Sequence, residues 1–330
     1  MTSRRILVAF HVLARREAAF LQPLKDAGFE LEFNELGRRF TEDELIARLQ
    51  GKCAVIAADE PYTDRVFAAC PDLKVVARFG VGFNSVDVEA ATRHRVPVAM
   101  AFGTNHESVA DYAFGMAMAL SLDLPRHHRT VAEGRWGGGF HPGFWGKTVG
   151  IVGLGRIGKA MARRCEPFGT VLLAHDIAPD EVFAIQHGIA LTGLDDLLRE
   201  SDIVSIHTPL DEKTRGLIGA RELGLMKPTA FIVSTARGGI IDEAALNDAL
   251  GHRRIAGAGL DVFVDEPPTG SPLLARDNVI LSPHIAGVDE NAERLMGERC
   301  VANILAVLEG RDPGEGFVLN PGVTVIKADS

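Results

Sequence analysis

Short strand-like and helix-like segments alternate along this chain, and this alternation limits the fold more than any other feature. One series of six strand-like runs begins at KTVGIVGLG (147–155) and continues through TVLLAHD, DIVSIHTPL, TAFIVSTARGG, IAGAGLDVF and NVILSPHIAG. Helical patterns such as GLDDLLRES and DEAALNDALGHRR separate these runs. The alternation predicts a parallel sheet with helices on both faces, and six strands are enough for a complete dinucleotide-type sheet.

A shorter series of the same kind occupies the first third of the chain. RILVAF (5–10), CAVIAA (53–58) and LKVVARF (73–79) are strand-like, while TEDELIARL (41–49) and SVDVEAATRH (85–94) have helical spacing. At 330 residues the chain is longer than one hydrophobic core usually supports, so two domains are expected.

Two long helical patterns flank the second series, at 105–124 and 291–310. The loop-like segment after the later one, RDPGEGFVLNPGV, is expected to return to the first domain. We therefore expect an α/β fold in which the first domain is discontinuous, residues 1–103 and 291–330, and a doubly wound parallel-sheet domain is inserted at 104–290.

Composition narrows the classes of partner. The formal net charge is −9, and no long basic run offers a footprint for nucleic acid or an anionic membrane, so a small-molecule ligand is expected. The four cysteines, Cys53, Cys70, Cys165 and Cys300, show no C-x-x-C spacing, which argues against a zinc site or a disulfide framework. We expect them to be buried thiols in a reducing cytosol.

Two apolar stretches could be mistaken for membrane-related segments. The start, MTSRRILVAFHVLARRE, faintly imitates a signal peptide, but charged residues at 15–17 close the stretch at once, and a first strand explains it more simply. The run AFGMAMALSL (113–122) is too short to span a bilayer and is expected to be a packed core helix.

A glycine motif marks a cofactor site at the start of the second series. G-x-G-x-x-G occurs at Gly153, Gly155 and Gly158, between a predicted strand and a predicted helix. The first glycine allows a tight turn, the second lets backbone approach a pyrophosphate, and the third allows close helix packing. Arg156 and Ile157, which complete the motif, lie at the helix N-terminus, where backbone amides can face the anion.

Asp176 ends the next strand, about where this motif requires a carboxylate to hold the ribose hydroxyls. A bare carboxylate would repel a 2′-phosphate, and residues 177–179 supply no arginine to replace it. The sequence therefore favours NAD over NADP.

Polar side chains follow three later strands, where a buried core has little use for them. Arg237 precedes two glycines, Asp261 stands in GLDVF, Glu266 precedes two prolines, and His284 lies in ILSPHIAG. In an open α/β sheet, ligands collect at the carboxyl ends of strands. These four side chains are therefore expected to converge near the nicotinamide.

Together these motifs resemble those of the NAD-dependent D-isomer-specific 2-hydroxyacid dehydrogenases, which include phosphoglycerate dehydrogenases and the hydroxypyruvate and glyoxylate reductases. The resemblance covers nearly the whole chain, from ARFGVGFNSVDVEAA through GKTVGIVGLGRIG and HTPL to TARGGIIDEAAL, AGLDVFVDEPP and SPHIAG. It implies two Rossmann-like domains, with an NAD-binding domain inserted into a flavodoxin-like substrate-binding domain.

The resemblance also implies roles for individual residues. Arg237, Glu266 and His284 match the family's catalytic residues, and Asp261 matches its nicotinamide-side aspartate. The substrate carboxylate is expected to meet Val81 and Gly82 through their backbone amides, with Arg78 as a further anion contact. The other expected cofactor-lining residues are Thr208, Pro209, Thr235, Ala236, Ala286 and Gly287.

The chemistry of the reaction explains these residue types. Reduction of a 2-oxo acid needs a hydride at the carbonyl carbon and a proton on its oxygen, and an imidazole can donate and recover that proton near neutral pH. His284 would be the acid in reduction and the base in oxidation. Glu266, if hydrogen-bonded to the ring, would orient it and favour its charged form, while Arg237 would hold the carboxylate and polarise the carbonyl.

Departures from the family pattern bear on the substrate. Where phosphoglycerate dehydrogenases place an arginine, this chain has Ala58, Asp59 and Glu60, and the two acids would repel a phosphate. Glyoxylate or a hydroxypyruvate-like acid is therefore expected, with 3-phosphoglycerate as the alternative. The presence of Glu266 argues against formate, and phosphite oxidation is a minority use in the family. Ser234, where an asparagine is common, removes no catalytic group.

Two further expectations concern association and function class. The helix at 106–122 and the following glycine-rich loop resemble the family's dimerisation element, which predicts a homodimer. Trp136 in that loop either reaches the partner subunit's site or only packs at the interface. An NAD-sensing binding protein, like the corepressors of this fold that keep the same residues, is the alternative from another class, although no basic run supports it.

Overall fold

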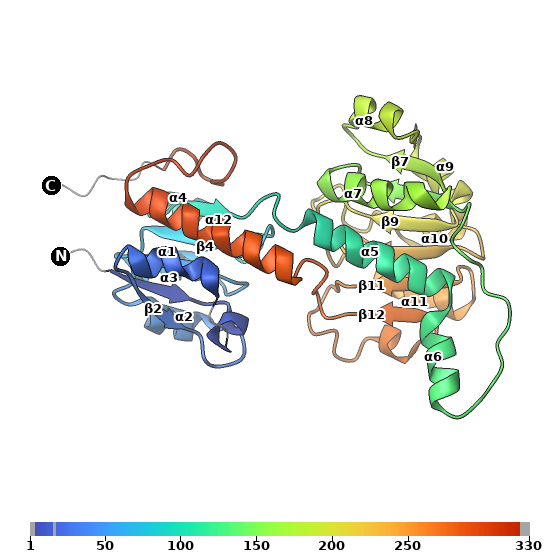
Figure 1. Cartoon of the computed structure of the whole chain (residues 1–330), viewed down its shortest axis with the longest axis horizontal. Helices are drawn as coiled ribbons and strands as arrows, with labels where there is room; N and C mark the ends of the chain where they lie inside the picture. The colour runs from blue at the N-terminus through green and yellow to red at the C-terminus, as the bar shows by residue number, and fades with distance from the viewer. Residues whose placement is uncertain (1–3, 16–17, 324–330) are drawn as a thin grey trace. The chain divides into compact units, whose positions relative to one another are not determined.

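The computed structural model describes residues 4–15 and 18–323, and the chain divides into two compact units (Figure 1). The first unit comprises Met1–Asn105 and Glu290–Ser330, and the second comprises His106–Asp289. The chain therefore enters the second unit after residue 105 and leaves it after residue 289, whereas the sequence placed these changes after residues 103 and 290.

A five-stranded parallel sheet forms the centre of the first unit, with the order β2-β1-β3-β4-β5. Its strands are β1 (Arg5–Val8), β2 (Glu30–Phe33), β3 (Ala54–Ala57), β4 (Val75–Arg78) and β5 (Val98–Met100). This is the flavodoxin-like order, with its switch point between β1 and β3. The sequence did not predict β2 or β5, because β2 carries two glutamates and β5 has only three residues.

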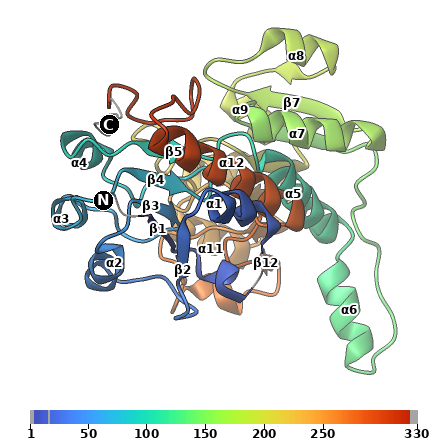
Figure 2. The same cartoon turned by 60° about the vertical axis from the view of Figure 1, so that its left-hand side comes forward.

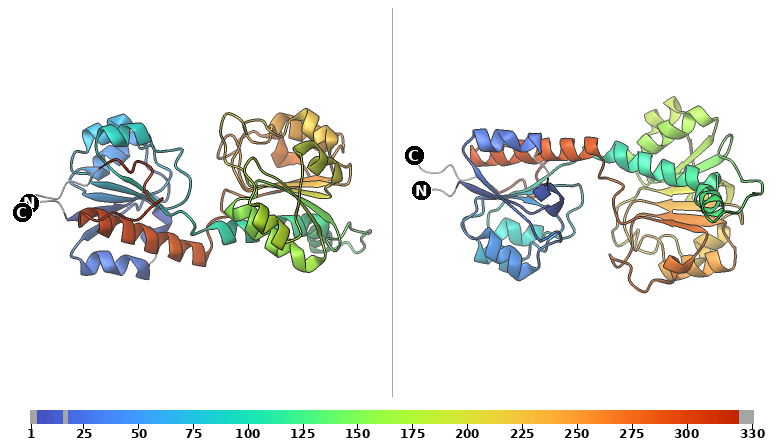
Figure 3. Two further views of the ribbon diagram at one scale, coloured as in Figure 1. Left: turned by 90° about the horizontal axis from the view of Figure 1, so that it is seen from above. Right: turned by 60° about the horizontal axis from the view of Figure 1, so that its bottom comes forward.

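Side chains that alternate along these strands build one core on each face of the sheet. Ile6 and Val8 pack on the side of α1 and α12, whereas Leu7 packs on the side of α2, α3 and α4 (Figure 3). The helices are α1 (Gln22–Asp26), α2 (Glu42–Leu49), α3 (Asp64–Ala69), α4 (Val88–Arg93) and α12 (Glu290–Leu308). All three strand residues are fully buried, so each face is covered.

The segment after α12 returns to the first unit, as the sequence predicted, and lies along the free edge of β5. The Leu319 amide donates to the Val98 carbonyl at 3.0 Å, and the Met100 amide donates to the Phe317 carbonyl at 2.7 Å. The Asn320 side chain accepts a hydrogen bond from the Val98 amide at 2.9 Å. Donors and acceptors at this edge are thereby paired, which closes the sheet on that side.

A seven-stranded parallel sheet forms the centre of the second unit, with the order β12-β11-β10-β9-β6-β7-β8. Its strands are β6 (Thr148–Val152), β7 (Val171–His175), β8 (Ala190–Leu191), β9 (Ile203–Ile206), β10 (Phe231–Ser234), β11 (Gly257–Leu260) and β12 (Val279–Leu281). This is the dinucleotide-binding order with one more strand, β12, at the edge. The six predicted strands are present; β8 was not predicted, because it has two residues and both are exposed.

Helices cover both faces of this second sheet (Figure 3). The helices are α5 (His106–Ser121), α6 (Leu124–Ala132), α7 (Arg156–Cys165), α8 (Glu181–Gln186), α9 (Leu194–Glu200), α10 (Ala220–Leu225) and α11 (Glu243–Gly251). α5 and α7 share the core on one face, and α9, α10 and α11 share the core on the other. The short 3-10 helices of the chain are η1 (His11–Arg15), η2 (Ala19–Leu21), η3 (Glu166–Phe168) and η4 (Pro272–Ala275).

Helix α6 and the loop after it project from the rest of the second unit (Figure 2). No residue of α6 is buried, and Trp136 in the following loop is 92% exposed. All four cysteines are buried and free, as predicted. Within the described ranges, no helix is both long enough and apolar enough to cross a membrane.

Candidate active site

The glycine loop between β6 and α7 has the packing that a dinucleotide site requires. Gly153 has a φ of +95°, and a Cβ there would lie 2.9 Å from backbone atoms of His207 and Thr208. A Cβ at Gly158 would lie 2.0 Å from the Gly153 carbonyl oxygen. By contrast, a Cβ at Gly155 would have no neighbour within 4 Å. The protein's own packing demands the first and third glycines, and the second leaves open space for a pyrophosphate at the N-terminus of α7.

Asp176 lies directly beside this loop. Its Oδ2 accepts a hydrogen bond from the Leu154 amide at 2.6 Å, and its Oδ1 accepts one from the Ala178 amide at 2.8 Å. Each carboxylate oxygen has a second lone pair, so ribose hydroxyls can still donate to it. A 2′-phosphate would meet a like charge at the same place.

Two threonines at the ends of the central strands fit the lining of a cofactor site. Thr208 follows β9 and Thr235 follows β10, and the hydroxyl oxygen of each is buried without a hydrogen-bond partner within the described protein. Buried hydroxyls are normally satisfied, and a bound dinucleotide can supply the missing partner. Of their neighbours, Pro209 is exposed and Ala236 is half-buried.

His207 is a core residue rather than a catalyst. Its ring nitrogen lies 2.9 Å from the Ser205 hydroxyl, and burial lowers its pKa to about 4. The imidazole is therefore neutral near pH 7 and a poor proton donor.

Arg237, Glu266 and His284 follow three neighbouring strands of the second sheet. β10, β11 and β12 are adjacent, and their last residues pair in register. Because all three strands are parallel, the loops that carry these side chains leave the same edge of the sheet. Arg237 is half-buried, and its Nη1 donates to the Ala236 carbonyl at 2.7 Å.

His284 and Glu266 form a hydrogen-bonded pair. The distance from His284 Nδ1 to Glu266 Oε2 is 2.8 Å, so the hydrogen bond expected between these two residues is present. Nε2 is therefore the ring nitrogen that can exchange a proton with a substrate. The side chain of His284 is 39% exposed, which leaves it within reach of one. The geometry is that of an acid–base group oriented by a carboxylate.

Asp261 fixes the loop that carries His284. This carboxylate is 1% exposed; Oδ1 accepts from the Ser282 hydroxyl at 2.5 Å and from the Ile285 amide at 2.9 Å, and Oδ2 accepts from the Ala286 amide at 2.8 Å. The Asp261 carbonyl also accepts from the His284 amide at 2.8 Å. These bonds hold His284 at a φ of +55°, a conformation that costs a non-glycine residue free energy. The sequence singled out Asp261 but not Ser282.

Two further residues position the site, and the sequence did not single them out. A Cβ at Gly238 would lie 1.9 Å from the Phe263 carbonyl oxygen, so the loop after Arg237 packs directly on the loop that leads to Glu266. Glu243 Oε1 accepts a hydrogen bond from the Val264 amide at 2.6 Å. The only sequence signal for Gly238 was its place after Arg237, and what it meets is visible only in three dimensions.

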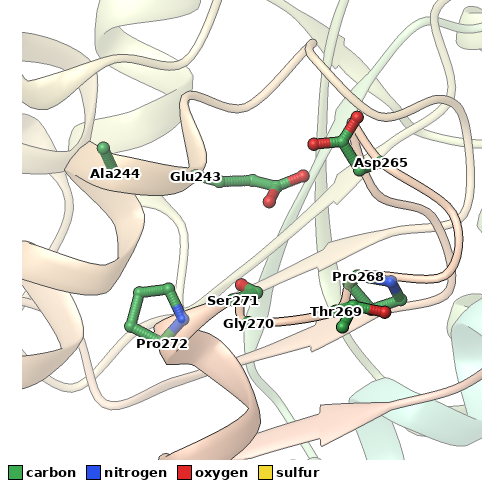
Figure 4. A pocket seen from close by; sticks show the side chains of 8 residues that line it. All are labelled: Glu243, Ala244, Asp265, Pro268, Thr269, Gly270, Ser271 and Pro272. Atoms are coloured by element: carbon green, nitrogen blue, oxygen red, sulfur yellow. The ribbon is translucent and has the colours of Figure 1, made fainter.

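A pocket of about 310 Å³ adjoins the segment 268–272. It is lined by Glu243, Ala244, Asp265, Pro268, Thr269, Gly270, Ser271 and Pro272 (Figure 4). None of the residues expected in catalysis lines it. In the part of the chain that the structure describes, no group of three His, Cys, Asp or Glu side chains could hold a metal ion. We assign this pocket no part in the chemistry.

In the first unit, the residues expected to bind substrate lie at the carboxyl end of β4. Arg78 is the last residue of that strand and is 6% exposed, and Val81 and Gly82 are half-buried in the loop that follows. The Arg78 guanidinium donates to the Asp59 carboxylate. Glu60 is fully buried, and that burial raises its pKa to about 7.

The glycine loop, Asp176 and the imidazole–carboxylate pair belong to one doubly wound unit. Together they define the class of protein, an oxidoreductase that uses a nicotinamide dinucleotide.

Comparisons with known proteins give the family. Residues 114–286 match the model of the D-isomer specific 2-hydroxyacid dehydrogenase, NAD binding domain. A glyoxylate reductase from Korarchaeum cryptofilum is 41% identical over 261 residues, which cover 77% of this chain and 79% of that protein. A D-3-phosphoglycerate dehydrogenase from Mycobacterium bovis is 40% identical over 284 residues, which cover 85% of this chain but 54% of that protein.

A solved structure agrees with these relatives. An NADPH-dependent glyoxylate/hydroxypyruvate reductase from Sinorhizobium meliloti, in complex with NADP and malonate, superposes with a TM-score of 0.82 at 30% identity, covering 98% of this chain and 99% of that one. This chain belongs to the D-isomer specific 2-hydroxyacid dehydrogenase family. It is an NAD-dependent oxidoreductase that interconverts a 2-oxo acid and its D-2-hydroxy acid.

Proposed function

We propose that this protein reduces glyoxylate or a hydroxypyruvate-like 2-oxo acid with NADH, and that His284 is the general acid. The observation that carries the proposal is the 2.8 Å hydrogen bond between His284 and Glu266, at the sheet edge that also carries the glycine loop. Bound NADH supplies the hydride. The residues of this chain then have to place the carbonyl, protonate its oxygen and hold the substrate carboxylate.

Each proposed role follows from the position of a side chain. His284 gives a proton from Nε2 to the carbonyl oxygen, because its Nδ1 is bonded to Glu266, and it takes that proton back in the oxidative direction. The Glu266 carboxylate fixes the ring and favours its charged form. Arg237, after the neighbouring strand, binds the substrate through its planar guanidinium. Asp261 holds His284 in place and lies on the nicotinamide side of the site.

We propose the first unit, Met1–Asn105 and Glu290–Ser330, as the substrate-binding domain and the second unit, His106–Asp289, as the NAD-binding domain. Val81 and Gly82 would bind the substrate carboxylate through their amides. Asp59 stands close to Arg78, and this negative charge disfavours a phosphorylated substrate such as 3-phosphohydroxypyruvate. The glyoxylate reductase relative supports the smaller substrate.

A substrate panel tests this proposal directly. Purified protein would be assayed for NADH oxidation with glyoxylate, hydroxypyruvate, pyruvate, phenylpyruvate and 3-phosphohydroxypyruvate, with NADPH in parallel. Turnover of glyoxylate or hydroxypyruvate with NADH is the expected result. A strong preference for 3-phosphohydroxypyruvate would contradict the proposed choice of substrate. Tight NADH binding without any turnover would favour the NAD-sensing alternative.

We further propose a cytosolic homodimer formed through α5, α6 and the loop that contains Trp136. In support, α6 has no buried residue, and Leu124, Val131 and Trp136 present apolar side chains that are more than half exposed. The four free, buried thiols are compatible with a reducing compartment. Light scattering of the purified protein should give twice the chain mass. Trp136→Ala should lower kcat if this residue reaches the partner subunit's site.

A further inference from the structure

Arg78 is a buried cation whose hydrogen bonds go to the protein itself. Its Nη1 donates to the Phe79 carbonyl at 2.9 Å and to the Ala57 carbonyl at 3.3 Å, while Nη2 donates to the Asp59 carboxylate. Asp59 can reach it because Ala57 and Arg78 pair in register at the ends of β3 and β4. A guanidinium engaged in this way connects the ends of two strands.

The loop at 79–84 begins at the residue after Arg78. It includes Val81 and Gly82, which are proposed to bind the substrate carboxylate. The Phe79 amide donates to the Ala57 carbonyl at 2.8 Å, which continues the strand pairing for one more residue. Gly80 has a φ of +148°, and a Cβ at this position would lie 3.2 Å from Arg78 Nη1. The loop therefore turns at Gly80 against the Arg78 side chain, and a shift of the guanidinium would displace the loop.

The Asp59 carboxylate holds Arg78 in this position. Asp59 pairs with Arg78 and lies 3.5 Å from Arg39, and its side chain is 45% exposed. Glu60 is fully buried, and its Oε2 accepts a hydrogen bond from the Ala58 amide at 3.0 Å. A buried guanidinium must be paired, and Asp59 supplies that pairing. This carboxylate offsets part of the charge of the guanidinium, whose Nε is buried without a hydrogen-bond partner within the described residues.

We propose that Arg78 is a positioning residue that holds the 79–84 loop in shape for the substrate carboxylate, and that Asp59 keeps Arg78 in this role. The inference rests on the proposed function of that loop. It replaces the expectation that Arg78 contacts the substrate as a free cation. Asp59 then affects the substrate in two ways, through the shape of the loop and through its own negative charge.

The two roles of Arg78 predict opposite effects of Asp59→Asn. If Arg78 were a direct anion contact, removal of the Asp59 charge would release the cation, and KM would fall, most of all for 3-phosphohydroxypyruvate. If Arg78 positions the loop, its anchor is weakened and KM for glyoxylate should rise about tenfold. KM for 3-phosphohydroxypyruvate should rise less, because the repulsion between Asp59 and the phosphate is lost at the same time. The kcat at saturation should change less than KM, because His284 and Glu266 are in the other unit.

The experiment compares Asp59→Asn and Arg78→Lys with the control Asp43→Asn, which removes a surface ion pair with Arg65 in the same unit. KM and kcat for glyoxylate and 3-phosphohydroxypyruvate would be measured at saturating NADH, together with the Kd of NADH. Lysine keeps the charge but lacks the planar fork, so Arg78→Lys should raise KM as well. A wild-type KM for glyoxylate in Arg78→Lys, or a lowered KM for glyoxylate in Asp59→Asn, would overturn the inference.

Amide hydrogen exchange gives a readout that needs no turnover. In Asp59→Asn, exchange at residues 79–84 should become faster than in the wild type, and in Asp43→Asn it should not. Unchanged exchange in this loop overturns the positioning role even if the wild-type protein proves to use another substrate. Failure of the wild type in the substrate panel, with faster loop exchange in Asp59→Asn, would instead count against the proposed function alone.

Discussion

At the scale of single residues, the proposed chemistry depends on one pair of side chains. His284 Nδ1 is bonded to Glu266, and the backbone of His284 is held by Asp261. These contacts explain why a residue other than glycine occupies a positive φ at this position. The strain is offset by the four hydrogen bonds that the carboxylate and carbonyl of Asp261 accept from the loop.

Removal of the imidazole should separate chemistry from cofactor binding. His284→Ala should lower kcat by roughly 10²- to 10⁴-fold, because the proposed general acid is then removed and water would have to supply the proton. The Kd of NADH, measured by fluorescence titration, should stay near the wild-type value. His252→Ala, at the exposed end of α11, is the matched control and should keep full activity. Full activity in His284→Ala would show that another group is the acid.

Glu60 should make the stability of the protein depend on pH. Burial raises its pKa from 4.5 to about 7, so the folded protein holds a proton that the unfolded chain gives up above about pH 4.5. The contribution of Glu60 to the free energy of unfolding should therefore be greatest below that pH and fall by on the order of 3 kcal/mol as the pH rises to about 7.

Glu60→Gln tests this assignment, since glutamine cannot ionise. Denaturant unfolding at about pH 5 and about pH 8 should show a smaller loss of stability in Glu60→Gln than in the wild type. Glu298→Gln, in an exposed ion pair on α12, should lose stability with pH as the wild type does. If Glu60→Gln and the wild type have the same pH dependence, Glu60 is ionised in the folded protein.

At the scale of elements, the sequence predicted most of the strands whose residues are buried, but it missed β5, which is buried and has only three residues. β1, β3, β4 and the strands of the second sheet other than β8 lie in largely apolar runs, which are readable without a structure. β2 and β8 were missed because they are edge strands with exposed or charged residues. Their pairing depends on the neighbouring strand rather than on their own composition.

The same distinction applies to the site. His284, Glu266 and Arg237 could be found because each follows a strand with a recognisable pattern. The role of Gly238 and the pairing of Asp59 with Arg78 could not, because both depend on which strands lie side by side. The contacts across a sheet are set by register, and a single sequence does not show register for parallel strands joined by long crossovers.

The loop after Arg237 packs on the loop that leads to Glu266. Gly238→Ala should therefore displace Glu266, although Gly238 itself lies in the other loop. A methyl group would lie 1.9 Å from the Phe263 carbonyl oxygen, so the loop that leads to Glu266 would have to move. We expect a loss of stability at the upper end of about 1–3 kcal/mol and a fall in kcat, because the Glu266–His284 hydrogen bond would be displaced. Thermal unfolding and steady-state kinetics would measure both.

Gly224→Ala is the matched control for this change. Gly224 lies in α10, and a Cβ there would meet no atom within 4 Å, so alanine should be neutral or slightly stabilising. Wild-type stability and turnover in Gly238→Ala would mean that the two loops are free to separate.

At the scale of the whole molecule, the chain builds two units that each have their own cores. The first unit is assembled from both ends of the chain, and the second is inserted between residues 105 and 290. His284 lies six residues before Glu290, where the chain returns to the first unit. The residues proposed for hydride and proton transfer thus belong to one unit, and those proposed to grip the substrate carboxylate, apart from Arg237, belong to the other.

This division predicts that the two ligands protect different parts of the chain from hydrogen exchange. NADH alone should slow exchange mainly in the β6–α7 loop and after β7, because a ligand stabilises the unit that it binds. Oxamate, an unreactive analogue of a 2-oxo acid, should add protection at residues 79–84 when NADH is present. Mass spectrometry of peptides from both units would measure the pattern. Equal protection of both units by NADH alone would mean that the cofactor by itself orders the substrate loop, and the assignment of one ligand to each unit would then be wrong.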